Sequence, residues 1–490
     1  MKETKNPDTE DVQKRSRLAN YWPDLCIILI TCLVLLIGAS WQLFTTPKSM
    51  FLNPTSDVAK YQCYTVGFWQ GMHGVTSSLT HKQCGFMNQK PVTNVQIGQF
   101  LQRHHAPQPI INFVTNQPVN SAFHVLPHEY PYLTIFIFSL ALIVPTTLFQ
   151  LAFAIWMAVL FAIMYLVIKR FRSRGAALAF ALFMVTGASV TGLARFDLIP
   201  AAATLFAVVC AAQKRWNWAY IFLALATLLK FYPGVLLVPF LLAQQMEIGK
   251  QPKWYAWQRW RALVIFVVLC VIGLGSSLLL SVEGTVGQFT FFGQRPIQAE
   301  SFGASLMWIA TSITHVPMAY AKTFGSLNIV NHASLMSKVS LLEDVLLVAG
   351  LLYTWWLQWR GKLNLAAACL LTLLVIIVTG KVFSPQYLIW VAPLVAYVGG
   401  PHKRWVISWS IIGLLTTIIY PIIYNQAPLV RVPYVPAFFP LAALRNFILL
   451  GFVLALFVYS TRQQQQPAPV EASPVETPLP GSMVAQEVNR

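Results

Sequence analysis

The stretch Cys26–Phe44, CIILITCLVLLIGASWQLF, decides the class of fold. It carries no charge, and an α-helix of about 20 apolar residues spans the hydrocarbon core of a bilayer. Comparable apolar runs recur along nearly the whole chain of 490 residues, which is 56% hydrophobic and only 10% charged. The first run lacks a clear cleavage pattern, which favours an uncleaved helix over a signal peptide. The sequence therefore predicts an all-α polytopic membrane protein.

Polar segments flank the apolar part of the chain. Residues 1–22 have mixed charge and residues 461–490 are rich in Gln and Pro, so neither segment can bury enough apolar surface to fold alone. We expect two disordered cytosolic tails around one transmembrane domain, residues 23–460.

Basic clusters between the apolar runs predict the topology. The positive-inside rule accounts for the net charge of +18 and makes nucleic acid an unsuitable partner. Placing the clusters in the cytosol gives about twelve spans and two large outer loops, residues 45–131 and 282–342, in which juxtamembrane amphipathic helices are expected. The clusters comprise residues 169–174, 213–216, 250–261, 358–362 and 401–404.

Two apolar segments must be interrupted for this topology to hold. Residues 218–242 must cross twice, and Pro233 favours a break because proline removes a backbone donor. Residues 132–144 must lie along the membrane face, or enter and return, before a span over 147–168. No internal repeat of fixed period is visible, which disfavours the alternative of a transporter or lipid-linked sugar flippase.

Cys63 and Cys84 are the two cysteines that share a polar loop. They can form a disulfide if that loop is extracytoplasmic, and the sequence leaves the unpaired state equally open.

An acidic residue begins a helical pattern in the first outer loop. In SDVAKYQCYTVGFWQGM (56–72), apolar residues recur at helical spacing after Ser56, a suitable N-cap, which predicts an amphipathic helix on the outer leaflet. The helix dipole would keep Asp57 ionised and available as a general base. The local pattern alone favours a simpler role, in which Asp57 only caps or charges the helix start.

Other acids stand in the same outer segments. Prolines bracket Glu129 and Tyr130, so Glu129 is either an acid/base group, a ligand of an acceptor hydroxyl, or part of an ion pair that organises the loop. Glu300 follows Gln298 in the second outer loop and is either a substrate ligand or part of a helix start.

Several basic residues are expected on the outer side, against the positive-inside rule: Arg195, Lys230, Arg295 and Lys381. Such cations need an anionic partner, and a lipid phosphate is a natural one. Arg195 stands near Asp197, and the sequence leaves open a structural salt bridge between them as well as phosphate binding by Arg195. Snorkelling is the alternative for Lys230. Gln386 follows Lys381 at the start of the next apolar run.

Cations near a few acids at one membrane face suit transfer of a sugar from a lipid phosphate. The cations would stabilise the departing phosphate while a carboxylate removes the proton of an acceptor hydroxyl. No cofactor or metal is expected, because the chain has no phosphate-binding Gly-rich loop, no DxD pair and no Cys/His metal spacing. The predicted partners are a lipid-linked sugar phosphate as donor, an acceptor with a free hydroxyl, and membrane lipids.

Six motifs between Asp57 and Pro393 resemble, in order and spacing, the GT-C polyprenyl-phosphate-mannose-dependent mannosyltransferases of glycosyltransferase family 87. They are SDVAKYQCY, EYPYL, RFDLIP, LLKFYPGVLLVPFLL, QRPIQAES and KVFSPQYLIWVAPL. Tyr132 departs from the family pattern, which commonly has a second proline there. The loop 73–128 is also longer than expected, which puts the acceptor in doubt.

The resemblance implies an inverting transferase that uses no nucleotide and has an extracytoplasmic active site, and we expect it in the plasma membrane. Its implied partners are a polyprenyl-phosphate sugar donor and a glycolipid or glycan acceptor. Asp57 matches the family's general base. The four outer cations would then bind the donor phosphate, and the remaining polar residues would orient substrates or those cations: Tyr61, Glu129, Tyr130, Asp197, Gln298, Glu300 and Gln386.

Overall fold

The computed structural model describes residues 7–43, 53–249 and 253–463. Helix α1 (Pro7–Leu43) begins inside the segment 1–22 that we expected to be a tail. Most of the expected C-terminal tail, from residue 464 onward, lies outside the described residues, as do residues 44–52 of the first outer loop.

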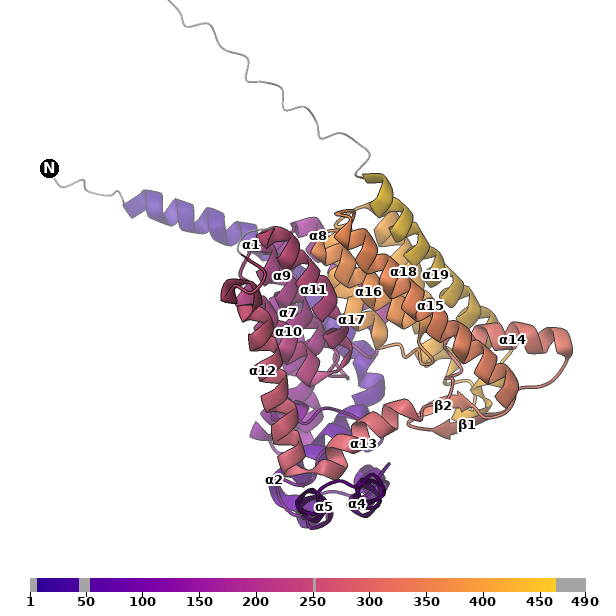
Figure 1. Ribbon diagram of the computed structural model, residues 1–490. Coiled ribbons are helices and arrows are strands. Elements are labelled where there is room, and N and C mark those ends of the chain that lie inside the picture. The colour runs from indigo at the N-terminus through magenta and orange to yellow at the C-terminus, as the bar shows by residue number, and fades with distance from the viewer. Residues whose placement is uncertain (1–6, 44–52, 250–252, 464–490) are drawn as a thin grey trace, which may run out of the picture.

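Helices of different lengths lie side by side in one bundle, and the helices of the first outer loop gather at one end of it (Figure 1). The bundle contains α1, α7 (Phe149–Phe171), α8 (Arg174–Ala188), α9 (Leu198–Ala212), α10 (Trp216–Leu229), α11 (Leu237–Ile248), α12 (Trp257–Leu280), α15 (Ala333–Trp359), α16 (Leu365–Thr379), α17 (Tyr387–Gly399), α18 (Lys403–Thr417) and α19 (Phe438–Gln463). The core consists of buried side chains from facing helices, such as Phe161 stacked on Phe180.

The described helices agree with an all-α membrane protein. Five of them are long and apolar enough to cross a membrane: Trp22–Leu43, Thr146–Phe171, Trp257–Leu280, Lys403–Ile423 and Phe438–Tyr459. Shorter apolar helices of 10–17 residues pack among them. The total of about twelve spans stays a prediction.

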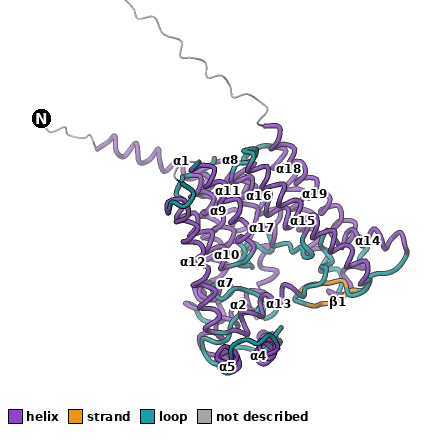
Figure 2. The backbone as a smooth tube through the Cα atoms, viewed as in Figure 1, coloured by secondary structure: helices purple, strands orange, loops and turns teal. Residues whose placement is uncertain are grey.

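Strands are confined to one small hairpin in the described part of the chain (Figure 2). Strands β1 (Tyr320–Thr323) and β2 (Ser326–Ile329) pair antiparallel, with Tyr320 opposite Ile329. Gly325 occupies the turn with a φ of 68°, a conformation that glycine adopts without strain.

The helix break predicted near Pro233 is present. Helix α10 ends at Leu229, Lys230 is extended, and a 3-10 turn over Tyr232–Leu236 leads into α11. The apolar run 132–144 forms only the short helix α6 (Thr134–Ser139) and a 3-10 turn before α7. Both interruptions lie near α2: Phe138 of α6 stacks on Tyr61, and Lys230 lies 5.0 Å from the centre of the Phe196 ring, which also contacts Tyr61.

The outer loops contain α2 (Asp57–Ser78), α3 (His81–Cys84), α4 (Asn94–Arg103), α5 (Gln108–Thr115), α13 (Val282–Gly293) and α14 (Phe302–Thr314). Helix α2 corrects one expectation. Its residues from Val58 to Phe68 are buried on nearly every side, so an amphipathic helix with one face on lipid is wrong here. The reason is that α6 and α7 cover it: Tyr61 stacks on Phe138 of α6 with ring centroids 4.2 Å apart.

A disulfide joins Cys63 of α2 to Cys84 at the end of α3. Of the two states that the sequence left open, the structure therefore has the paired one. It closes a loop over a sequence separation of 21 residues next to the buried part of α2.

Replacing Cys63 and Cys84 together by alanine should lower the free energy of unfolding by about 3 kcal/mol, because the unfolded chain regains the entropy of that loop. Thermal unfolding of the purified protein in detergent measures the effect. A reductant should destabilise the parent and leave the double variant unchanged. A parent protein whose melting is insensitive to reductant, and equals that of the variant, would contradict the prediction.

Candidate functional site

Asp57 contacts a cation from a distant part of the chain. It is the first residue of α2, and the Ser56 hydroxyl caps the helix by accepting from the Ala59 backbone N–H at 3.0 Å. Arg195 lies in the turn between α8 and α9, and its Nη2 is 2.7 Å from Asp57 Oδ2. The structure thus joins the predicted base directly to one of the predicted phosphate-binding cations.

Lys60 is a second cation at this carboxylate, and the sequence analysis missed it. Its Nζ lies 3.5 Å from Asp57 Oδ1 and 3.6 Å from Glu129 Oε2. The i,i+3 spacing from Asp57 on one helix was the signal available in the sequence. Glu129 therefore takes part in an ion pair that connects the end of the first outer loop to α2.

The surrounding charges control the protonation of Asp57. Burial favours the neutral acid, but the positive charges of Arg195 and Lys60 outweigh it and hold the pKa of Asp57 below its ordinary value. Burial likewise opposes the charge of Lys60, and the carboxylates of Glu129 and Asp57 nevertheless raise its pKa. Asp57 is therefore ionised, and it is a weak base as long as these cations stay bound to it.

Asp197 pairs with Lys230, so the salt bridge to Arg195 that the sequence left open is not formed. The Asp197 side chain is 1% exposed and its Oδ1 accepts from Lys230 Nζ and, at 2.5 Å, from Trp390 Nε1. The Lys230 ammonium also lies 4.7 Å from the centre of the Trp390 ring. This second ion pair fixes Lys230 beside the first one, because Asp197 follows Arg195 by two residues.

Two more predicted residues lie around these ion pairs. Gln386, just before α17, accepts a hydrogen bond from Arg195 Nη1. Arg295 donates from Nη2 to the Ser326 hydroxyl at 3.1 Å and lies 5.6 Å from the centre of the Phe291 ring. The hairpin β1–β2 thus positions Arg295.

Tyr61 and Tyr130 form an aromatic support next to the ion pairs. Their ring centroids are 5.5 Å apart, and Tyr130 meets Phe196, the residue between Arg195 and Asp197, edge-on at 5.0 Å. Both tyrosines are buried. They pack against the turn that carries the charged residues.

Three predicted residues lie in a separate network. The Lys381 side chain is exposed, and its backbone carbonyl accepts from the Gln298 N–H at 2.9 Å. The Glu300 carboxylate accepts from Arg445 Nη1 at 2.8 Å and from the Tyr424 hydroxyl at 2.7 Å. Sequence reasoning missed Arg445, although a lone arginine inside an apolar run signals a buried partner.

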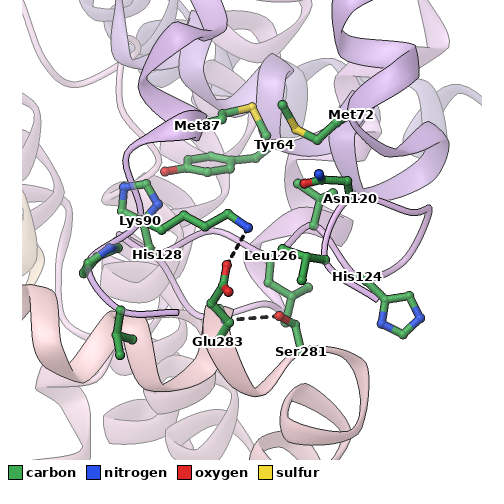
Figure 3. A pocket seen from close by; sticks show the side chains of 15 residues that line it. Tyr64, Met72, Met87, Lys90, Asn120, His124, Leu126, His128, Ser281 and Glu283 are labelled. Carbon is green, nitrogen blue, oxygen red and sulfur yellow. Dashed lines mark hydrogen bonds and ion pairs between the residues drawn. The ribbon is translucent and has the colours of Figure 1, made fainter. Parts of the chain in front are cut away.

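A small cavity of about 40 Å³ lies between the first outer loop and α13, close to Lys60 and Glu129 (Figure 3). Tyr64, one turn beyond Lys60, and His128, next to Glu129, both line it. Across the cavity Lys90 Nζ pairs with Glu283 Oε1 at 2.5 Å. Burial lowers the pKa of His128. This volume accepts a water-sized group, well short of a sugar ring.

Among the described residues, no three His, Cys, Asp or Glu side chains come together in a way that could hold a metal ion.

The comparisons with known proteins identify the family. No curated protein matches the chain by sequence. The family model of glycosyltransferase family 87 matches residues 130–385, which is more than half of the chain. The matched region contains Arg195, Lys230, Arg295 and Lys381, and Asp57 lies before it. Together with its apolar helices, this match shows that the chain is a membrane glycosyltransferase and belongs to glycosyltransferase family 87.

Proposed function

We propose that this enzyme transfers a hexose, with mannose the first candidate, from a polyprenyl-phosphate sugar to a glycolipid or glycan acceptor. The observation that carries the proposal is the contact of one carboxylate with several cations. Asp57 lies 2.7 Å from Arg195 and 3.5 Å from Lys60, and the charge of Lys230 also acts on it. A base beside anion-binding groups is the arrangement that sugar transfer from a lipid phosphate requires.

In this mechanism Asp57 takes the proton of the acceptor hydroxyl, and the acceptor oxygen attacks the anomeric carbon from the face opposite the phosphate. The bond between that carbon and the phosphate oxygen breaks, and the polyprenyl phosphate leaves with the electron pair. Configuration at the anomeric carbon is inverted. The leaving phosphate is bound by Arg195, Lys230 and Arg295. Lys381 lies outside this cluster, and its exposed side chain is proposed as a fourth ligand.

Donor binding would also activate the base. Asp57 is ion-paired to Arg195 in the structure, which keeps its pKa low. A guanidinium binds phosphate oxygens bidentately, so the donor phosphate competes with Asp57 for Arg195. Once Arg195 turns to the phosphate, Asp57 loses its strongest counter-charge and its pKa rises. The base is then strongest when the sugar to be transferred is in place.

The other predicted residues would orient these groups. Gln386 holds Arg195, Asp197 holds Lys230, and Glu129 holds Lys60, each through the contacts described above. Tyr61 and Tyr130 support the turn of Arg195. Gln298 holds the backbone at Lys381, and Glu300 holds Arg445.

We place the site on the extracytoplasmic face of the plasma membrane. Disulfides form and persist in oxidising compartments, and the bond between Cys63 and Cys84 lies in the same loop as Asp57. The basic clusters between helices support the same orientation by the positive-inside rule.

Purified protein in nanodiscs, supplied with labelled donors and a glycolipid extract, tests the proposal. Label should move from polyprenyl-phosphate mannose to a glycolipid, and the new linkage should have the anomeric configuration opposite to that of the donor. Polyprenyl-phosphate glucose and galactose in parallel reactions determine the sugar. Transfer from a nucleotide sugar, with none from any lipid-linked donor, would refute the proposed donor class.

The pH dependence of the rate should separate the free enzyme from the donor complex. The acid limb of kcat/KM reports the free enzyme, in which Asp57 has a lowered pKa, so kcat/KM should fall only below the ordinary pKa of an aspartate. The acid limb of kcat should lie at higher pH, because bound donor removes Arg195 from Asp57. Identical limbs would argue against activation by the donor.

A further inference from the structure

A second cavity, of about 270 Å³, lies at the opposite end of the bundle from Asp57. The Ser56 hydroxyl, next to Asp57, donates to Gln150 Oε1 at the start of α7. Helix α7 has 23 residues, a rise of about 35 Å, and Arg172 just after its other end lines the cavity. The cavity is therefore separate from the candidate active site.

Arg172 gives the cavity its positive charge. Asp24, an acid at this end of the bundle, is already bound by Lys169 at 2.6 Å and Arg174 at 3.0 Å. Among the described residues no carboxylate forms an ion pair with Arg172, whose Nη2 makes only a long contact of 3.5 Å with the Val398 carbonyl. Its guanidinium can therefore bind an anion.

Backbone groups add to this positive potential. Asn364 and His402, which both line the cavity, are the N-cap residues of α16 and α18, helices of 15 residues each. The N-terminus of a helix carries a partial positive charge that favours a bound anion.

Apolar side chains form part of the cavity wall beside these polar groups. Leu370, Leu371 and Leu456 line the cavity, together with the rings of Trp405 and Tyr459. A free inorganic anion makes no use of such walls, whereas a molecule with an anionic head and a hydrocarbon chain contacts both parts. The acyl chain then lies along the partly exposed rings of Trp405 and Tyr459, and the head group lies at Arg172.

We propose that this cavity binds the phosphate head group of an anionic membrane lipid, in the leaflet opposite the candidate active site. The lipid packs between α16, α17, α18 and α19 and is bound by Arg172. This inference does not depend on the proposed donor or on the chemistry at Asp57.

Native mass spectrometry of the full-length, delipidated protein tests the site with phosphatidylglycerol, phosphatidylcholine and inorganic phosphate as separate probes. We expect one phosphatidylglycerol to bind about fivefold more tightly than phosphatidylcholine, the effect of one arginine on an anionic lipid. Arg172→Gln should abolish this preference. Arg170→Gln, with the same charge change at the same end of α7 but outside the cavity, should keep it. Equal effects of the two variants, or phosphate displacing the lipid, would overturn the proposal.

Photo-crosslinking identifies the occupant directly. Tyr459, which lines the cavity, is replaced by p-benzoyl-phenylalanine in the full-length protein, and the membranes are irradiated. Crosslinks to phosphatidylglycerol that disappear with Arg172→Gln support the site. Crosslinks to the chain's own residues 464–490 would show that a protein segment fills the cavity and would overturn the lipid proposal.

Discussion

Asp57→Asn is expected to lower kcat for sugar transfer by about 10²- to 10⁴-fold, the contribution of a general base. The asparagine side chain has the same size and can still accept a hydrogen bond from Arg195, so the donor site should survive. It cannot take the proton of the acceptor hydroxyl at neutral pH. The measurement is the turnover of labelled polyprenyl-phosphate sugar under saturating donor, with donor affinity determined separately.

Asp344→Asn is the matched control. It makes the same change of charge and shape at an exposed position on α15. It should leave kcat unchanged. Asp57→Glu should retain part of the activity, since it keeps a carboxylate near Arg195. If Asp57→Asn turned over at the parental rate, Asp57 would only be a helix cap, the simpler role that its local sequence favours.

Arg445→Leu is expected to lower the free energy of unfolding by about 3 to 5 kcal/mol, because it leaves a buried carboxylate without its counter-charge. The side chains of Arg445 and Glu300 are 0% and 1% exposed and lie 2.8 Å apart. Arg445 also donates to the Glu300 backbone carbonyl at 2.7 Å, and its guanidinium lies 3.9 Å from the centre of the Phe383 ring. Thermal unfolding in detergent measures the loss.

The double variant Glu300→Leu with Arg445→Leu tests the physical cause. Removing both charges eliminates the uncompensated carboxylate, so the double variant should recover most of the stability that Arg445→Leu loses. A double variant less stable than the single one would show that the pair acts mainly through its hydrogen bonds to the backbone.

The features that the sequence predicted best depend on local chemistry. Ser56 caps α2 as expected, because the cap needs only a hydroxyl three residues before the N–H that it accepts from. The break between α10 and α11 follows from Pro233 within a short apolar segment. Charged residues in apolar surroundings were expected to meet, and Asp57, Arg195 and Lys230 do lie in one cluster.

The choice of partners could not be predicted, because it depends on how the helices pack. Asp197 stands two residues from Arg195 but binds Lys230, which α10 brings to it. Glu300 binds Arg445, which is 145 residues away. The burial of α2 was missed for the same reason. The sequence shows the apolar positions of this helix, but it does not show that Phe138 and other residues of α6 and α7 pack against it.

The short helices have a consequence for how a substrate arrives. Helices α8, α10 and α17 have 15, 14 and 13 residues, so each rises only about 20 Å, against a hydrocarbon thickness of about 30 Å. Lys230 directly follows α10, Gln386 directly precedes α17, and Arg195 lies between α8 and α9. We expect this hydrophobic mismatch to place the charged groups in a recess below the level of the lipid head groups. The proposed isoprenoid donor would then enter sideways, with its tail remaining in the bilayer.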